Sequence, residues 1–114
     1  MRVLVCGGRH YNDFDAAKRA LDALPVKPSI IIEGGAKGGD RMGRLWAEEN
    51  GIHYATVPAL WNKFGRAAGF KRNEAMLLLK PQYCVAFPGG RGTASMIELC
   101  TSYGVIVWRP YNPC

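Results

Sequence analysis

The sequence has no apolar run near the roughly 20 residues that a membrane-spanning helix needs, and its first residues lack a signal-peptide pattern. These absences favour a cytoplasmic protein with no membrane partner, which is our expectation. The chain has 114 residues, of which 48% are hydrophobic. This is enough for one domain with one core, so we expect residues 1–114 to form a single domain.

Cysteine pairs with CxxC spacing are also absent, although the chain has four cysteines, Cys6, Cys84, Cys100 and Cys114. The first two fall in expected strands and Cys100 falls in an expected helix. We therefore expect free buried thiols in a reducing compartment rather than disulfides. Cys114 is the thiol that we expect to be exposed and reactive. No His, Cys and Asp cluster has metal-ligand spacing, so we expect neither a metal nor another cofactor.

Two familiar phosphate-binding motifs are missing. A Walker A loop requires GxxxxGK[ST], but Lys37 stands between Ala36 and Gly38. The dinucleotide motif GxGxxG is approached at residues 90–95, yet Ser95 stands where the third glycine belongs. The sequence therefore excludes a P-loop NTPase and a dinucleotide-binding protein with the usual glycine motif.

What the chain does contain is a repeated junction of apolar strand, glycine-rich loop and helical pattern. The strands are expected at 2–6, 29–33 and 83–87, and each is followed by a loop with a Gly-Gly pair and a basic residue. The carboxyl ends of parallel strands share one edge of a sheet, so the three loops should meet there. The candidate ligand-binding residues are Gly7, Gly8, Arg9, Gly34, Gly35, Lys37, Gly38, Asp40, Pro88, Gly89, Gly90, Arg91, Gly92 and Thr93.

The loop at residues 88–93 has the chemistry of a phosphate site. Glycines allow the backbone to approach a phosphate closely, and the first amides of a helix have no partner within that helix. Arg91 adds a fork of donors suited to phosphate. Thr93 either caps the following helix or donates its hydroxyl to a phosphate oxygen.

Charge is unevenly distributed along the chain. The net charge is +6, from 15 Lys and Arg against 9 Asp and Glu. A one-sided positive field favours an anionic partner, either a nucleotide or a nucleic acid. The basic residues in or beside the expected loops are Arg9, Lys37, Arg41, Arg66, Lys71, Arg72 and Arg91.

The alternation of strands and helices predicts an α/β, Rossmann-like three-layer sandwich with a mostly parallel five-stranded sheet. Right-handed crossovers make 3-2-1-4-5 the simplest strand order. Helices are expected at 14–24, 41–50, 70–79 and 94–103, further strands at 54–57 and 105–108, and an irregular segment at 58–69. All strands except 54–57 are apolar enough to be covered on both faces.

The motifs resemble a known superfamily. The sequence at 88–93 is similar to the PGGxGT signature of LOG-type proteins, and the sequence at 35–40 is similar to the GAxGxD loop of the Smf/DprA group. Together they define the SLOG superfamily. Within this superfamily, the chain most resembles the small YspA-like, YpsA-related branch, and the resemblance covers nearly the whole chain. The features that carry it are the opening VLVCGGR, the GGAxGxD loop, residues 58–61, 68–69 and 72–73, and AFPGGRGTA.

The resemblance implies candidate catalytic residues and a dimer. LOG enzymes are phosphoribohydrolases that cut the base from a nucleoside 5′-monophosphate, and Arg72 and Met76 match the arginine–methionine spacing of their helix. Their catalytic Glu follows PGGxGT closely, where this chain has Ala94 and Ser95 and its nearest later carboxylate is Glu98. Arg72 and Glu98 are therefore the catalytic candidates. The resemblance also implies a homo-oligomer.

Three functions remain open on the sequence. The first is a binding or sensing module for a nucleotide or nucleotide-derived phosphate ligand. The second is a nucleotide-processing hydrolase of the LOG type, and the third is a DprA-like binder of single-stranded DNA. Four aromatic residues in expected loops, Tyr11, Trp61, Phe64 and Phe70, would stack a base in any of them. For Trp61 and Phe64, the alternative is that they cover the core under the long loop.

Overall fold

The computed structural model describes residues 1–111, so the prediction for Cys114 lies outside the described residues. Five parallel strands form one sheet: β1 (Arg2–Cys6), β2 (Ile30–Glu33), β3 (His53–Thr56), β4 (Tyr83–Ala86) and β5 (Ile106–Trp108). The order across the sheet is β3-β2-β1-β4-β5. The predicted fold class and strand order are therefore confirmed.

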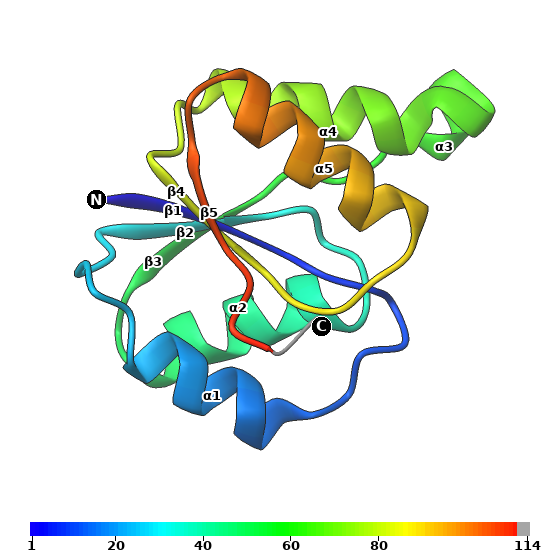
Figure 1. Cartoon of the computed structure of the whole chain (residues 1–114). Coiled ribbons are helices and arrows are strands. Elements are labelled where there is room, and N and C mark those ends of the chain that lie inside the picture. The colour runs from blue at the N-terminus through cyan, green and yellow to red at the C-terminus, as the bar shows by residue number, and fades with distance from the viewer. Residues whose placement is uncertain (112–114) are drawn as a thin grey trace.

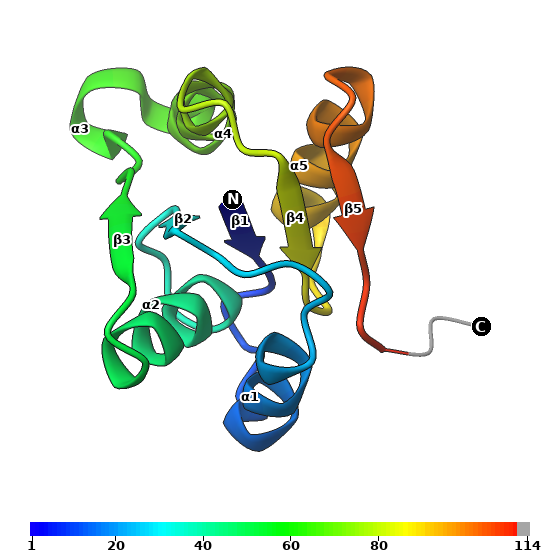
Figure 2. The ribbon, with the colours of Figure 1, turned by 90° about the vertical axis from the view of Figure 1, so that its left-hand side faces the viewer.

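Helices cover both faces of the sheet, which makes three layers (Figure 1). The helices are α1 (Phe14–Asp22), α2 (Gly39–Glu49), α3 (Trp61–Phe64), α4 (Ala68–Leu78) and α5 (Arg91–Ser102), with a 3₁₀ turn, η1 (Gly65–Ala67). Helices α1 and α2 lie on one side of the sheet, and α4 and α5 lie on the other, with α3 beside the start of α4 (Figure 2).

The central strand β1 supplies side chains to both cores. Successive residues of a strand point to opposite faces. Val3 and Val5 accordingly pack in the cluster under α1 and α2, whereas Leu4 and Cys6 pack in the cluster under α4 and α5. Val3, Leu4 and Val5 are all fully buried. A continuous apolar run is what a parallel strand covered on both faces requires.

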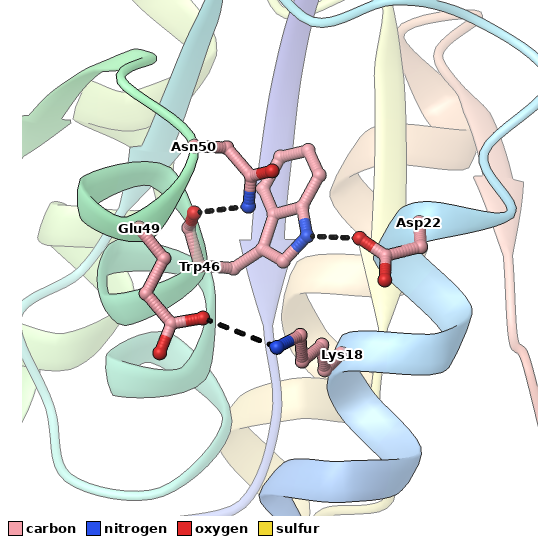
Figure 3. A network of polar contacts seen from close by, with 5 residues as sticks. All are labelled: Lys18, Asp22, Trp46, Glu49 and Asn50. Atoms are coloured by element: carbon pink, nitrogen blue, oxygen red, sulfur yellow. Dashed lines mark hydrogen bonds and ion pairs between the residues drawn. The ribbon is translucent and has the colours of Figure 1, made fainter.

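Polar contacts join α1 to α2 beneath the sheet (Figure 3). The Nε1–H of buried Trp46 donates to Oδ1 of Asp22 over 2.8 Å, so the indole keeps a hydrogen bond as it packs in the core. Lys18 and Glu49 form an exposed ion pair of 3.7 Å, which contributes little to stability. Asp13 caps α1 through a bond from the Ala16 amide, as its position before the helix predicts.

The structure differs from the sequence prediction at several element boundaries. Helix α5 begins at Arg91 rather than at residue 94, and α2 begins at Gly39 rather than at residue 41. Segment 58–69 is not irregular, because it contains α3, η1 and the start of α4. Strand β5 is an edge strand, and Ile106 is 60% exposed, so the prediction that β5 is covered on both faces is wrong.

The three described cysteines, Cys6, Cys84 and Cys100, are buried free thiols. The Sγ atoms of Cys6 and Cys84 lie 3.9 Å apart on neighbouring strands. Hydrogen bonding to Cys100 and to Cys6, together with burial, raises the pKa of the Cys84 thiol. Within residues 1–111, none of the helices combines the length and the apolar character needed to cross a membrane.

Candidate functional site

The three glycine-rich loops meet at the carboxyl edge of the sheet and are joined through their backbones. The amide of Gly39, after β2, donates to the carbonyl of Gly8, after β1, over 3.0 Å. The amide of Gly8 in turn donates to the carbonyl of Pro88, after β4, over 2.9 Å. Residues far apart in the sequence thus form one continuous floor.

Several glycines are required because these loops lie so close together. A Cβ atom at Gly38 would lie 2.0 Å from the carbonyl oxygen of Gly8, and the φ angle of Gly38 is +79°. A Cβ at Gly39 would lie 2.4 Å from the Cα of Gly7. Side chains at these positions would separate the first loop from the second, so these glycines build the floor.

A cavity of about 1030 Å³ opens above this floor. The loops after β1, β2 and β4 contribute backbone and basic side chains to its wall, and α3, α4 and α5 complete it. Its lining comprises Cys6, Gly7, Gly8, Arg9, His10, Tyr11, Gly35, Ala36, Lys37, Asp40, Trp61, Arg72, Asn73, Met76, Pro88, Gly89, Gly90, Arg91, Gly92, Thr93 and Met96. The volume matches pockets that take small organic ligands.

Two glycines of the third loop have a different role from those of the floor. No atom of the described residues lies within 4 Å of a Cβ built on Gly90 or Gly92, although both line the cavity. Gly90 is the N-cap of α5, which has no side-chain cap among the described residues. The first amides of α5 therefore have neither a helical acceptor nor a capping side chain. Such a helix start is suited to an anion.

Helix α4 braces the second and third loops against each other. The guanidinium Nη1 of Arg72 donates to the carbonyl of Gly34 over 2.6 Å, and its Nε donates to Oδ1 of Asn73 over 3.1 Å. The Nδ2 of buried Asn73 donates to the carbonyl of Gly92 over 3.3 Å. Arg72 and Asn73 line the cavity and also hold its two walls in position.

Asp40 is the carboxylate in the lining of the cavity. It is buried, and its Oδ2 accepts hydrogen bonds from the amides of Gly34, over 3.1 Å, and Ala36, over 3.4 Å. Burial raises the pKa of Asp40 from 3.8 to about 6, against the opposing effect of Arg72. A carboxyl group with this pKa titrates near neutral pH inside the candidate site.

Glu33 is a second buried carboxylate, at the end of β2. It accepts hydrogen bonds from the amide of Gly35 and the hydroxyl of Thr56. These bonds tie the second loop to β3. Glu33 is outside the main cavity and lines a neighbouring hollow of about 130 Å³ with Lys37, Arg41 and others. Within residues 1–111, no group of His, Cys, Asp and Glu side chains has a metal-binding arrangement.

The structure brings most of the sequence-predicted residues together, but not all of them. Gly34 and Gly38 are buried beneath the lining rather than in it. Glu98 is exposed on α5 and does not line the cavity. The alternative that Thr93 caps the last helix is wrong, because α5 begins at Arg91. Thr93 is buried in its first turn, and its Oγ1 occupies the space beside Gly89.

The basic residues divide into two groups. Arg9, Lys37, Arg72 and Arg91 line the cavity. Arg41, Arg66 and Lys71 do not. Four cations thus surround a cavity with one acidic side chain, which favours an anionic occupant.

Sequence reasoning did not name His10, Asn73, Met76 and Met96 as site residues, although all four line the cavity. Asn73 and Met76 follow Arg72 by one and four residues, so the spacing of helix α4 was the available signal. The sequence left Trp61 open between stacking a base and covering the core, because its place depends on a short helix in a segment expected to be irregular.

The fold and the site define an α/β protein of the Rossmann-like class with glycine-rich loops at one sheet edge. The model of the YspA, cpYpsA-related SLOG family matches residues 1–64. The chain is also 33% identical over 104 residues to the gene 61 protein of Mycobacterium phage D29, covering 82% of each chain. The chain therefore belongs to the YspA, cpYpsA-related SLOG family, as its motifs predict. No solved structure matches it.

Proposed function

We propose that the protein binds a nucleotide or a nucleotide-derived phosphate ligand in the cavity at the carboxyl edge of its sheet, as a binding or sensing module. Membership of the SLOG family is consistent with a nucleotide-related role. The phosphate lies at the start of α5, against the backbone of Gly90, Arg91 and Gly92. The rest of the ligand extends into the cavity between the first loop and α4.

The observation that carries this proposal is the open backbone at Gly90 and Gly92. Both glycines have free space where a side chain would be, and they stand at the start of a 12-residue helix that has no capping side chain within residues 1–111. Their lack of side chains is not needed for packing, in contrast to Gly38 and Gly39. A phosphate is the group that exposed first-turn amides and a nearby arginine bind best.

Thermal denaturation with and without nucleoside monophosphates, using AMP as the first probe, tests the proposal. A ligand that binds only the native state raises the melting temperature in a concentration-dependent way. Single-stranded DNA is titrated in parallel at two salt concentrations. Affinity for DNA that falls steeply with salt, without any response to mononucleotides, would favour the nucleic-acid alternative instead.

A nucleotide hydrolase is the second candidate, and Asp40 is the observation that favours it. N-glycosidic cleavage needs a carboxyl group beside the reacting centre, to activate water or stabilise positive charge. Glu98 is exposed and outside the lining, whereas Asp40 lines the cavity and has a pKa of about 6. A hydrolase built on this site would therefore use Asp40 in place of Glu98.

We also propose that the chain forms homo-oligomers and folds as one domain. The exposed apolar side chains Leu78, Tyr103 and Ile106, at 80%, 71% and 60% exposure, support the first part. Light scattering of the purified protein measures the oligomeric state. A single cooperative unfolding transition of the whole chain is the result expected for one domain.

A further inference from the structure

Trp61 is the large aromatic side chain that lines the cavity while remaining mostly exposed. It begins the short helix α3 and is 59% exposed. A Cβ built on Gly69 of α4 would lie 3.5 Å from Cη2 of Trp61, so the indole lies beside α4 at this glycine. The indole therefore lies next to α4 with much of its surface uncovered.

The other aromatic side chains of this region do not share that position. Phe70 is 52% exposed but does not line the cavity. Phe64 is outside the lining too, and the Nζ atoms of Lys63 and Lys71 lie 5.2 Å and 5.0 Å from its ring centroid. Lysine cations thus already occupy the surroundings of that ring. Of these aromatic residues, Trp61 is the one available to a ligand in the cavity.

Tyr11 contributes a second aromatic ring to the lining, from the loop after β1. Its ring is stacked on Phe87, with centroids 5.3 Å apart and planes 10° apart. That stacking attaches Tyr11 to the core cluster under α1 and α2. Tyr11 thus has a partner in the protein, whereas Trp61 has a large free surface.

We propose that Trp61 forms the base subsite of the cavity, where it stacks on the planar base of the bound nucleotide. This inference rests on the proposed function, which supplies the phosphate site at the start of α5. It adds that the ligand carries a purine or pyrimidine ring, and so excludes a simple sugar phosphate as the preferred ligand. Stacking on an aromatic side chain tolerates any base, because every base has a π-face.

Paired titrations with AMP and ribose 5-phosphate test the subsite, since the two probes share the phosphate and ribose but differ in the base. Native protein is expected to bind AMP more tightly. Trp61→Ala should weaken AMP binding by about 5- to 150-fold, the effect of losing one base–aromatic stack. The affinity for ribose 5-phosphate should stay unchanged, and Trp61→Phe should restore part of the affinity for AMP.

Phe70→Ala is the matched control, because Phe70 is similarly exposed and lies outside the lining. It should leave both affinities unchanged. Tryptophan fluorescence provides a second readout, because Trp46 is buried, Trp108 is half-buried, and neither lines the cavity. AMP should therefore change the emission of native protein far more than that of Trp61→Ala.

The outcomes separate this subsite from the phosphate site. Equal affinity of native protein for the two probes, or an equal loss of both in Trp61→Ala, would overturn the base subsite and leave the phosphate site standing. Retained AMP affinity in Trp61→Ala would overturn it as well. Failure of native protein to bind either probe would contradict the proposed function, and the base subsite with it.

Discussion

The guanidinium of Arg72, on α4, donates a 2.6 Å hydrogen bond to the carbonyl of Gly34, in the loop after β2. A bond this short from a charged donor is of the stronger kind. It joins two segments 38 residues apart in sequence, at a side chain that also lines the cavity. Arg72 therefore has a structural role in addition to any contact with ligand.

Replacing Arg72 with alanine should lower both stability and affinity. Loss of the bond to Gly34 leaves a buried carbonyl without its partner, at a cost of about 1–3 kcal/mol in the free energy of unfolding. Urea denaturation measures that loss, and AMP titration at a temperature where the variant is folded measures the affinity. Arg66→Ala, at an exposed arginine outside the lining, is the control that should change neither quantity.

The raised pKa of Asp40 predicts a dependence of stability on pH. Burial raises this pKa from 3.8 to about 6, so the native state holds the proton more tightly than the unfolded chain does. The resulting contribution to stability is fully present below about pH 4 and is lost as the pH rises through about 6.

Asp40→Asn should remove that dependence. The difference between native protein and variant in unfolding free energy should change by on the order of 3 kcal/mol between about pH 4 and about pH 7. The sign is fixed: raising the pH should destabilise the native protein relative to the variant. Parallel curves for the two proteins would mean that Asp40 titrates at its ordinary value.

Catalysis should be absent, or should depend on Asp40 and not on Glu98. Incubation with nucleoside monophosphates, followed by chromatography for free bases, is expected to show no multiple turnover by native protein. Any turnover that is found should persist in Glu98→Gln, because Glu98 is exposed and outside the cavity. Turnover that disappears in Glu98→Gln would establish Glu98 as the catalytic carboxylate and refute this account of the site.

Removing the hydrogen bond between α1 and α2 should lower the stability of the protein moderately and leave its affinity for ligand unchanged. Asp22→Ala removes the acceptor of the 2.8 Å bond from the buried indole of Trp46. The variant should lose about 1–3 kcal/mol of unfolding free energy, with no change in AMP affinity, since neither residue lines the cavity. Asp15→Ala, at another exposed acidic residue of α1, is the matched control.

The sequence was sufficient to predict the strand order, because the central strands are apolar on both faces and the crossovers have one hand. It was also sufficient to predict that the glycine loops meet. It did not predict which glycines pack against other loops and which stay open, since that depends on approaches such as Gly38 to Gly8. These distances arise only when the three loops are assembled.

The sequence also left undetermined whether the side chains of Glu98 and Trp61 would lie in the site. The helix α5 starts three residues earlier than its apolar pattern indicates, at Arg91, because an exposed glycine serves as its N-cap. Trp61 reaches the cavity because residues 61–67 form α3 and η1 where the prolines and glycines nearby indicated an irregular segment. Local propensity did not reveal this tertiary arrangement.

The central claim is that a phosphate binds the open backbone at the start of α5, and Gly90→Val tests it most directly. No atom of residues 1–111 lies within 4 Å of a Cβ at this position, so the side chain has room, and the melting temperature without AMP checks that the variant is folded. The branched side chain would cover the amides that we assign to the phosphate.

The measurement is the rise in melting temperature that saturating AMP produces. Native protein and Ala94→Val, which adds a branched side chain to the first turns of α5 outside the lining, should both show it. Gly90→Val should show none. An undiminished rise in the folded Gly90→Val protein would contradict the account, because the phosphate would then bind elsewhere.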